Sequence, residues 1–300
     1  LACAKPSFAN HKAYQKIYRT PYGIASCYNA LPIGGGSLTL SRIVLSRLAV
    51  RAKDSEHFLN DLLPHTVRVL CEYIEQKIRF LVERTHFFTS NFLVEEGFLK
   101  LENFTGMFGV VGMNECVNTL MEKEGCGDRY GYSEKADRLA QEIMEKMTQC
   151  VMNFESKYCD CTDHHFTIHA QVGIDVDYDI SPGVRIRIGD ELPLYEHLEH
   201  CAKMQPYFNS GVGDIFPFDE TAKRNPAAVV DLIKGAFSKG MRYFSTYSDD
   251  CDVIRITGYL VKKSDIEKLD KGIRVQQANA MWGYGEVKNA RIYERKVRNL

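Results

Sequence analysis

The sequence predicts an α/β protein, and three features support this class. Long segments carry apolar residues at helical spacing, shorter segments alternate and are rich in β-branched residues, and the two kinds follow one another along the chain. The 300 residues are 45% hydrophobic and 26% charged, which is enough for a large core. Because the sequence has no obvious linker, repeat or low-complexity tract, we expect one compact domain.

The helical segments are recognised by their apolar spacing and by the residues at their starts. We expect a long amphipathic helix over 64–84 with Pro64 in its first turn, after a short helix that Ser55 caps. A helix at 191–205 would carry His197 and His200 on one solvated face. The same spacing predicts helices over 42–51, 114–124, 135–158 and 226–240.

We expect a strand or hairpin over 166–180 and strands over 241–248 and 252–261. The last of these reads DVIRITGYLV and contains Gly258. Glycine weakens a strand and usually marks a bulge or a close approach of the backbone. Gly258 therefore needs an explanation beyond strand formation.

Charge and composition exclude several classes of function. The chain has 38 basic and 39 acidic side chains and no concentrated basic stretch, so we expect no nucleic-acid partner. Its apolar runs are too short for a membrane span and its start shows no signal pattern, which predicts a cytoplasmic protein with no membrane partner. The ten cysteines lack the regular spacing of a disulfide framework, so we expect them to be reduced thiols. The metal-capable run CDCTDHH at 159–165 lacks zinc-finger spacing, so we expect a polar loop and no metal site.

The run Arg255–Tyr259 offers a chemical reason for Gly258. An α-carbon radical is stabilised between an amide nitrogen and a carbonyl if the centre can flatten, and glycine has no Cβ to prevent it. The run, RITGY, resembles the signature of glycyl radical enzymes, which lies near the carboxyl terminus; here 42 residues follow Gly258. The resemblance implies a stored radical on Gly258, with Arg255, Thr257 and Tyr259 supporting it.

A stored radical must be passed to a more reactive group, and a cysteine thiol suits that role. Cys27 lies in PYGIASCYNALPIGGGSLTLSRIVLSRLA, which resembles the thiyl-cysteine region of anaerobic ribonucleotide reductases. A buried cysteine is otherwise an ordinary small hydrophobic residue. The resemblance implies that Cys27 carries the catalytic thiyl radical.

A third stretch, 104–120, resembles the glycine-rich strand of the reductases that runs into a helix. Asn114 and Glu115 at the helix start could bind a polar substrate or accept a proton, or could simply cap the helix. Cys116 lies beside them and is the rival thiyl candidate and a candidate substrate contact. The sequence leaves both alternatives open.

A fourth stretch, 198–219, also resembles the reductases, and the four stretches follow the order of that family. The paired CxxC motifs that hold zinc in the reductases are missing, because the corresponding stretch TYSDDCDVIRITGY contains only Cys251. The missing zinc motifs, the long tail and the sequences around Cys27 and Glu115 together make the chain most similar to the YjjI family of glycine radical enzymes. Leu1 in place of methionine predicts a carboxyl-terminal portion of a longer protein.

The resemblance implies a ten-stranded α/β barrel with inner finger loops. Residues 1–300 would form this barrel, incomplete at the amino end, and 240–300 its glycyl radical segment. A radical S-adenosylmethionine activase would install the oxygen-sensitive radical on Gly258, with no cofactor bound to the chain. Cys27 would then abstract hydrogen from a small-molecule substrate under anaerobic conditions. The alternatives are a divergent anaerobic ribonucleoside-triphosphate reductase without the zinc site and a non-catalytic spare part for a damaged radical domain; a homodimer stays open.

Overall fold

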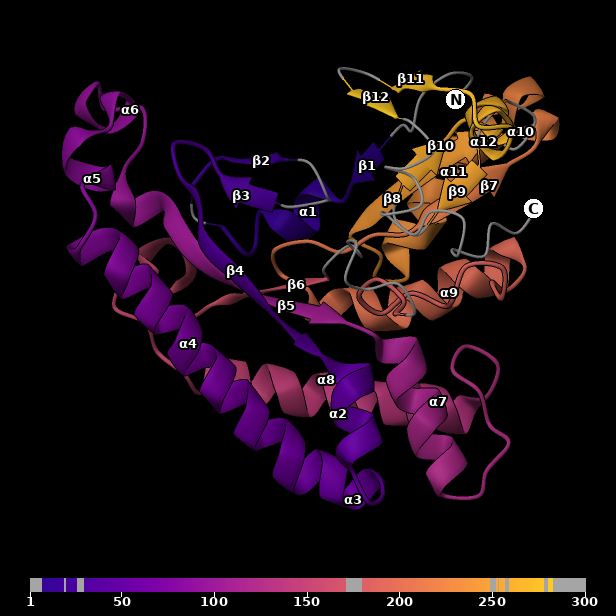
Figure 1. Ribbon diagram of the computed structural model, residues 1–300, viewed down its shortest axis with the longest axis horizontal. Helices are drawn as coiled ribbons and strands as arrows, with labels where there is room; N and C mark the ends of the chain where they lie inside the picture. The colour runs from indigo at the N-terminus through magenta and orange to yellow at the C-terminus, as the bar shows by residue number, and fades with distance from the viewer. Residues whose placement is uncertain are drawn as a thin grey trace.

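A computed structural model describes residues 7–18, 20–25, 30–170, 180–248, 252, 254–256, 259–277 and 280–282. It confirms a mixed α/β class with a parallel sheet (Figure 1). Within these residues no helix is both long and apolar enough to cross a membrane.

The central sheet has three parallel strands in the order β4-β5-β6. Their bounds are β4 Gly36–Val44, β5 Phe104–Val111 and β6 Thr167–Ala170. Every residue of β5 is buried, as expected for an inner strand of a parallel sheet that is covered on both faces. The pairing brings Arg42, Gly109 and His169 into one row across the sheet.

One face of this sheet packs against helices (Figure 1). Phe108 and Val110 of β5, and Ile168 and Ala170 of β6, belong to the same buried cluster as the apolar stripe of the long helix. Because side chains alternate along a strand, Gly109 and His169 lie on the opposite face. The helices of this part are α2 Leu45–Arg51, α3 Ser55–His57, α4 Leu63–Glu83, α7 Met113–Lys123 and α8 Glu134–Met152.

The structure differs from the sequence prediction at several boundaries, and the helix expected over 135–158 ends at Met152. The helix expected over 42–51 begins only at Leu45, because β4 continues to Val44 and stays paired with β5 up to Val111. The helix cap before α3 is Asp54, not Ser55, and its carboxylate accepts a hydrogen bond from the backbone N–H of His57. A π-helical turn, Phe58–Leu62, then joins α3 to α4, so the chain stays helical through Pro64.

A second three-stranded sheet has the order β1-β8-β7, with β7 parallel and β1 antiparallel to β8. Apolar residues of α9, α11 and β7 form its core, including Leu198, Ile233 and Phe216. The elements of this part are β1 Ser7–Ala9, α9 Leu194–Met204, β7 Ile215–Phe218, α10 Glu220–Arg224, α11 Pro226–Ser238 and β8 Tyr243–Ser248.

Short hairpins and helices complete the described chain. The hairpins are β2 Tyr22–Ile24 with β3 Ala30–Pro32, β9 Ile254–Ile256 with β10 Tyr259–Val261, and β11 Val275–Gln277 with β12 Ala280–Trp282. The helices are α1 His11–Tyr14, α5 Phe87–Ser90, α6 Phe92–Glu95 and α12 Lys263–Asp270. The strand predicted over 166–180 is present as β6, and 171–179 lie outside the described residues. The described strands do not close into a ten-stranded barrel.

Candidate active site

The structure describes the chain on both sides of the two central radical candidates. Cys27, Thr257 and Gly258 themselves lie outside the described residues. The strand predicted over 252–261 is in fact two short strands, and β9 pairs antiparallel with β10 so that Ile256 lies opposite Tyr259. Arg255 belongs to β9 and Tyr259 to β10.

The hairpin that flanks Cys27 is anchored at Ala30, three residues after Cys27. Strands β2 and β3 pair antiparallel, with Ile24 opposite Ala30. The backbone N–H of Ala30 donates to the carbonyl of Ser210 at 2.5 Å, and the hydroxyl of Tyr18 donates to the carbonyl of Ala30 at 2.5 Å. Burial raises the pKa of Tyr18, so this hydroxyl stays a hydrogen-bond donor.

Residues 209–211 connect this hairpin to the central sheet. The N–H of Ser210 donates to Ile168 at 3.1 Å, and the N–H of Ala170 donates to Gly211 at 2.9 Å. His169 and Gly211 form a parallel bridge. Ala30, three residues after Cys27, is therefore linked to the carboxyl end of β6, which is where parallel sheets commonly place their ligand sites.

His169 is the polar side chain at that position, and it was not singled out in the sequence. It is 1% exposed, and its Nδ1 atom has no hydrogen-bond partner in the described part of the chain. Burial lowers the pKa of His169 to about 4, and the charge of Arg185 acts in the same direction. The ring is therefore neutral at physiological pH. A histidine at an alternating position of a fully buried strand is the sequence signal that would have found it.

Glu115 and Asn114 lie at the start of α7, one turn beyond β5. Oε1 of Glu115 accepts hydrogen bonds from the Ser181 hydroxyl at 2.6 Å and from the Asn114 amide at 3.2 Å, while Oε2 accepts from the Ser181 N–H at 3.0 Å. The helix cap is Gly112, and no side chain caps it. Glu115 is therefore bound to the neighbouring segment, and neither predicted residue caps the helix through its side chain.

The segment 181–185 joins the Glu115 region to the end of β6. The N–H of Gly112 donates to the carbonyl of Ser181 at 2.9 Å. A Cβ on Gly183 would lie 2.7 Å from Cβ of Ala170, so these two backbones are in close contact. Glu115 and His169 are thus positioned by one continuous segment at the carboxyl ends of neighbouring strands.

Cys116 does not share this environment. Its side chain is fully buried in the core formed by the central sheet and its helices. Burial, followed by the charge of Glu115, raises the pKa of Cys116 well above its usual value. Among the described residues, Cys116 is thus part of the apolar core.

The prediction that His197 and His200 lie on a solvated face of the helix over 191–205 is wrong. His197 and His200 are each 3% exposed, because α9 packs this face against α8 and the segment before β7. Buried imidazoles need polar partners, and His197 Nε2 lies 2.9 Å from Asp214 Oδ2 while His200 Nδ1 lies 3.2 Å from Asp137 Oδ2. Burial by itself would lower the pKa of His197, but Cys201 and Asp214 outweigh it and raise it to about 10.

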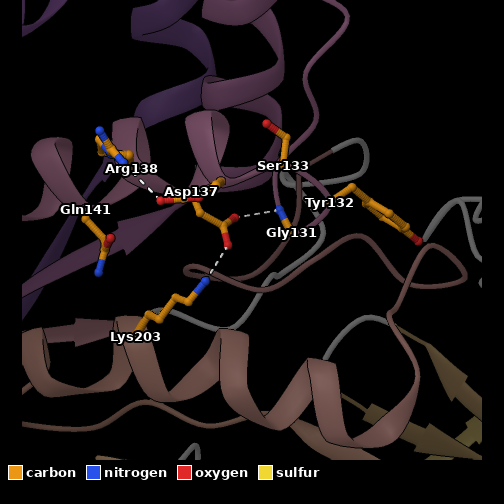
Figure 2. A pocket seen from close by; sticks show the side chains of 8 residues that line it. Gly131, Tyr132, Ser133, Asp137, Arg138, Gln141 and Lys203 are labelled. Carbon is orange, nitrogen blue, oxygen red and sulfur yellow. Dashed lines mark hydrogen bonds and ion pairs between the residues drawn. The ribbon is translucent and has the colours of Figure 1, made fainter.

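An open pocket of about 570 Å³ lies beside Asp137 (Figure 2). Its charged groups are already paired with one another: Asp137 accepts from the Gly131 N–H at 2.8 Å and from Lys203 Nζ at 3.2 Å, and Arg138 bonds Glu134 at 3.0 Å. The pocket is a polar hollow at the surface, and its acidic and basic side chains are paired: Asp137 with Lys203, and Glu134 with Arg138.

The cysteines of the 159–165 run contact the central sheet instead of gathering around an ion. The sulfur of Cys159 accepts from the Gly106 N–H at 3.2 Å, and the Cys161 thiol donates to the Phe104 carbonyl at 3.4 Å. No three of the metal-capable side chains of this run converge in the described structure.

The fold is similar to part of the fold of glycyl radical enzymes and anaerobic ribonucleotide reductases. A glycyl radical enzyme from Archaeoglobus fulgidus matches 98% of this chain with 49% of its own, at a TM-score of 0.67 and 12% identity. An anaerobic ribonucleotide reductase matches 87% of this chain with 46% of its own, at a TM-score of 0.63 and 17% identity. At such identities the likeness concerns the fold alone.

The chain belongs to the family described as "Glycyl radical enzyme YjjI-like", whose model matches residues 1–298. It is 41% identical over 302 residues to an uncharacterized protein of Haemophilus influenzae, covering 100% of this chain and 59% of that protein. It is 40% identical over 299 residues to the uncharacterized protein YjjI of Escherichia coli strain K12, covering 99% and 57%. The resemblance to YjjI is confirmed, and the chain spans less than two thirds of these relatives.

Proposed function

We propose that this chain is the radical-bearing portion of an enzyme that stores a radical on Gly258 and uses it through a thiyl radical on Cys27. The observation that carries the proposal is the family match over 1–298, which includes both residues. Paired strands on either side of 257–258 support it, because they fix the ends of the segment that contains Gly258.

The choice of Cys27 over Cys116 is supported by the burial of Cys116 and by the described strands that flank Cys27. Cys116 is fully buried in the apolar core. The hairpin around Cys27 is instead anchored at Ala30, next to the polar end of β6. A thiol that must reach a substrate carbon belongs in the second environment.

The polar groups at the strand ends are assigned to the substrate. Asn114 and Glu115 would orient a polar substrate, with Glu115 also able to accept a proton. His169, neutral and with Nδ1 unpartnered in the described chain, would supply a hydrogen-bond acceptor or a base. Arg255, Thr257 and Tyr259 would shape the surroundings of Gly258.

The reaction begins when a radical S-adenosylmethionine activase removes one hydrogen atom from the Gly258 α-carbon. The glycyl radical takes hydrogen from the Cys27 thiol, and the thiyl radical takes hydrogen from a carbon of a small-molecule substrate. After the substrate has reacted, hydrogen returns to Cys27 and then to Gly258. Each transfer between Gly258, Cys27 and the substrate moves one hydrogen atom, and these transfers need no cofactor bound to the chain.

Such chemistry requires enclosure, because water, oxygen and stray side chains would quench a thiyl radical. We therefore assign 1–300 to an α/β barrel of ten strands with inner finger loops that is completed by a longer protein, and 240–300 to its radical segment. The enzyme would act anaerobically in the cytoplasm, and association into a homodimer is compatible with this assignment.

The test uses the longer protein, incubated with its activase without oxygen and examined by electron paramagnetic resonance. We expect a glycyl signal that Gly258→Ala abolishes, and backbone cleavage at Gly258 on exposure to air. No glycyl signal, or cleavage at another residue, would overturn the proposal. Tight binding of ribonucleoside triphosphates would instead favour the reductase alternative, and complementation of a damaged radical enzyme without turnover would favour the spare-part alternative.

A further inference from the structure

Three side chains with metal-binding atoms converge between α9 and β7. His197 and Cys201 are four residues apart and so lie on one face of α9, and Asp214 directly precedes β7. Their ligand atoms all lie within 4.8 Å of one another, and all three side chains are at most 8% exposed. No other group of three such residues occurs in the described part of the chain. We call these three residues the α9 cluster.

The spacing of the α9 cluster is close to that of a tetrahedral metal site. Nε2 of His197 lies 2.9 Å, and Sγ of Cys201 4.0 Å, from Oδ2 of Asp214. A zinc ion bound at about 2.0–2.3 Å would hold these pairs about 3.4–3.6 Å apart. Each of the two separations thus has to change by only about 0.5 Å, which rotamer adjustments on α9 can supply.

The surroundings hold the carboxylate in a suitable orientation. Oδ1 of Asp214 accepts from the N–H of Ile215 at 2.7 Å and lies 3.6 Å from Nε of Arg185, which also donates to the carbonyl of Gly213 at 2.7 Å. Oδ2 consequently points at His197 and Cys201. Supporting interactions of this kind orient the ligands of established metal sites. Phe216 packs against the His197 ring at 4.9 Å between centroids and limits its movement.

We propose that His197, Cys201 and Asp214 bind one divalent transition-metal ion of the zinc type. Mixed nitrogen, sulfur and oxygen donors favour zinc, cobalt or iron over magnesium or calcium. Binding displaces the proton shared by His197 and Asp214 and the proton of the Cys201 thiol, and water completes the fourth position. The resulting charges, two positive on the metal, one positive on Arg185 and two negative on the ligands, sum to one positive charge.

Such an ion would link α9 to the sheet that contains β8. β7 is hydrogen-bonded to β8 through pairs such as Phe216 with Thr246, and β8 ends at Ser248, from where the chain continues to β9 and Gly258. The ion would thus fix the sheet from which the chain continues toward Gly258. No metal site is predicted from the sequence, because Asp214 is 13 residues from Cys201 and no standard motif spans that gap.

Cobalt titration of the reduced, metal-free chain under anaerobic conditions tests the proposal. We expect one Co²⁺ per chain, with a thiolate-to-cobalt charge-transfer band in the near ultraviolet that Zn²⁺ abolishes by competition. Loss of outer-shell partners alone weakens metal sites by about 10–100-fold. Cys201→Ser should therefore remove the band and weaken Co²⁺ binding by at least about 100-fold.

Cys150→Ser is the matched control, because Cys150 is a half-buried thiol on α8 that belongs to no such group. It should leave the titration unchanged. Absence of the charge-transfer band from the unsubstituted chain would overturn the proposal without any variant, leaving an ordinary ion pair between His197 and Asp214. A band that persists in Cys201→Ser, with circular dichroism confirming a folded chain, would overturn it as well.

Discussion

Glu115 and Ser181 are joined by two hydrogen bonds, one from the serine hydroxyl at 2.6 Å and one from its backbone N–H at 3.0 Å. Both oxygens of the carboxylate are therefore used, one by each donor. The contact holds the start of α7 against the chain that continues to Gly183 and Arg185. Any catalytic use of Glu115 must start from this fixed orientation.

We expect Glu115→Gln to destabilise the fold, because it removes the negative charge that strengthens the two hydrogen bonds from Ser181. Hydrogen bonds to charged groups contribute about 1.5–3 kcal/mol, so the free energy of unfolding should fall by about that amount. Urea denaturation measures the change. Glu122→Gln is the control, since Glu122 is exposed on the same helix. Equal stability of the two variants would show that the Ser181 contact contributes nothing.

The proposed hydrogen transfer between Gly258 and Cys27 predicts that exchange with deuterated solvent changes the shape of the radical signal. A thiol exchanges its hydrogen with solvent, so repeated transfer in D₂O should replace the Gly258 α-hydrogen and collapse the glycyl doublet. Cys27→Ser should retain the doublet in D₂O, whereas Cys116→Ser should lose it as the unsubstituted enzyme does. The opposite pattern would assign the thiyl radical to Cys116.

The sequence predicted the elements best where local pattern and tertiary packing agree. The apolar stripe of 64–84 became the core face of α4, through residues such as Val67 and Ile74. At 42–51 they disagree: the helical spacing there is overridden at Arg42–Val44, where pairing with β5 keeps the chain extended. Local propensity is a weak preference that a partner strand can reverse.

The candidate site was only partly predictable, for a physical reason. Asn114 and Glu115 follow a recognisable strand and so could be placed at its end. Ser181 and His169 come from segments that are distant in sequence from Glu115, and only the sheet order brings them to one edge. The burial of His197 likewise depends on Asp214, a partner that helical spacing cannot reveal.

His169 predicts a pH-dependent stability. Its pKa is about 4 in the folded chain, against 6.5 for an ordinary histidine, because burial disfavours the charged ring. The unfolded chain therefore binds the proton first, and this contribution to stability is complete above pH 6.5 and lost as the pH falls toward 4. At pH 5 the loss amounts to about 2 kcal/mol.

Denaturant titrations at pH 7 and pH 5 measure this dependence. His169→Gln should reduce the difference between the two pH values by about 2 kcal/mol relative to the unsubstituted chain. His65→Gln is the control, because His65 is exposed on α4 and should leave the difference unchanged. An unaltered pH dependence in His169→Gln would mean that the imidazole is not kept neutral by the fold.

Gly112 links the end of β5 to α7, and two features of its position require glycine. Its φ is +80°, in the left-handed region, and a Cβ there would lie 2.8 Å from Cγ2 of Ile180 and 2.9 Å from Oγ of Ser46. Gly112→Ala should therefore add backbone strain of about 1–2 kcal/mol and an overpacking cost of about 1–3 kcal/mol. Gly97→Ala separates the two effects, because Gly97 has a φ of +76° and nothing within 4 Å of the added Cβ. Thermal and urea unfolding should show the larger loss of stability for Gly112→Ala. Equal losses of stability in the two variants would mean that Ile180 and Ser46 move aside freely. The segment that carries Ser181 would then not be held tightly against α7.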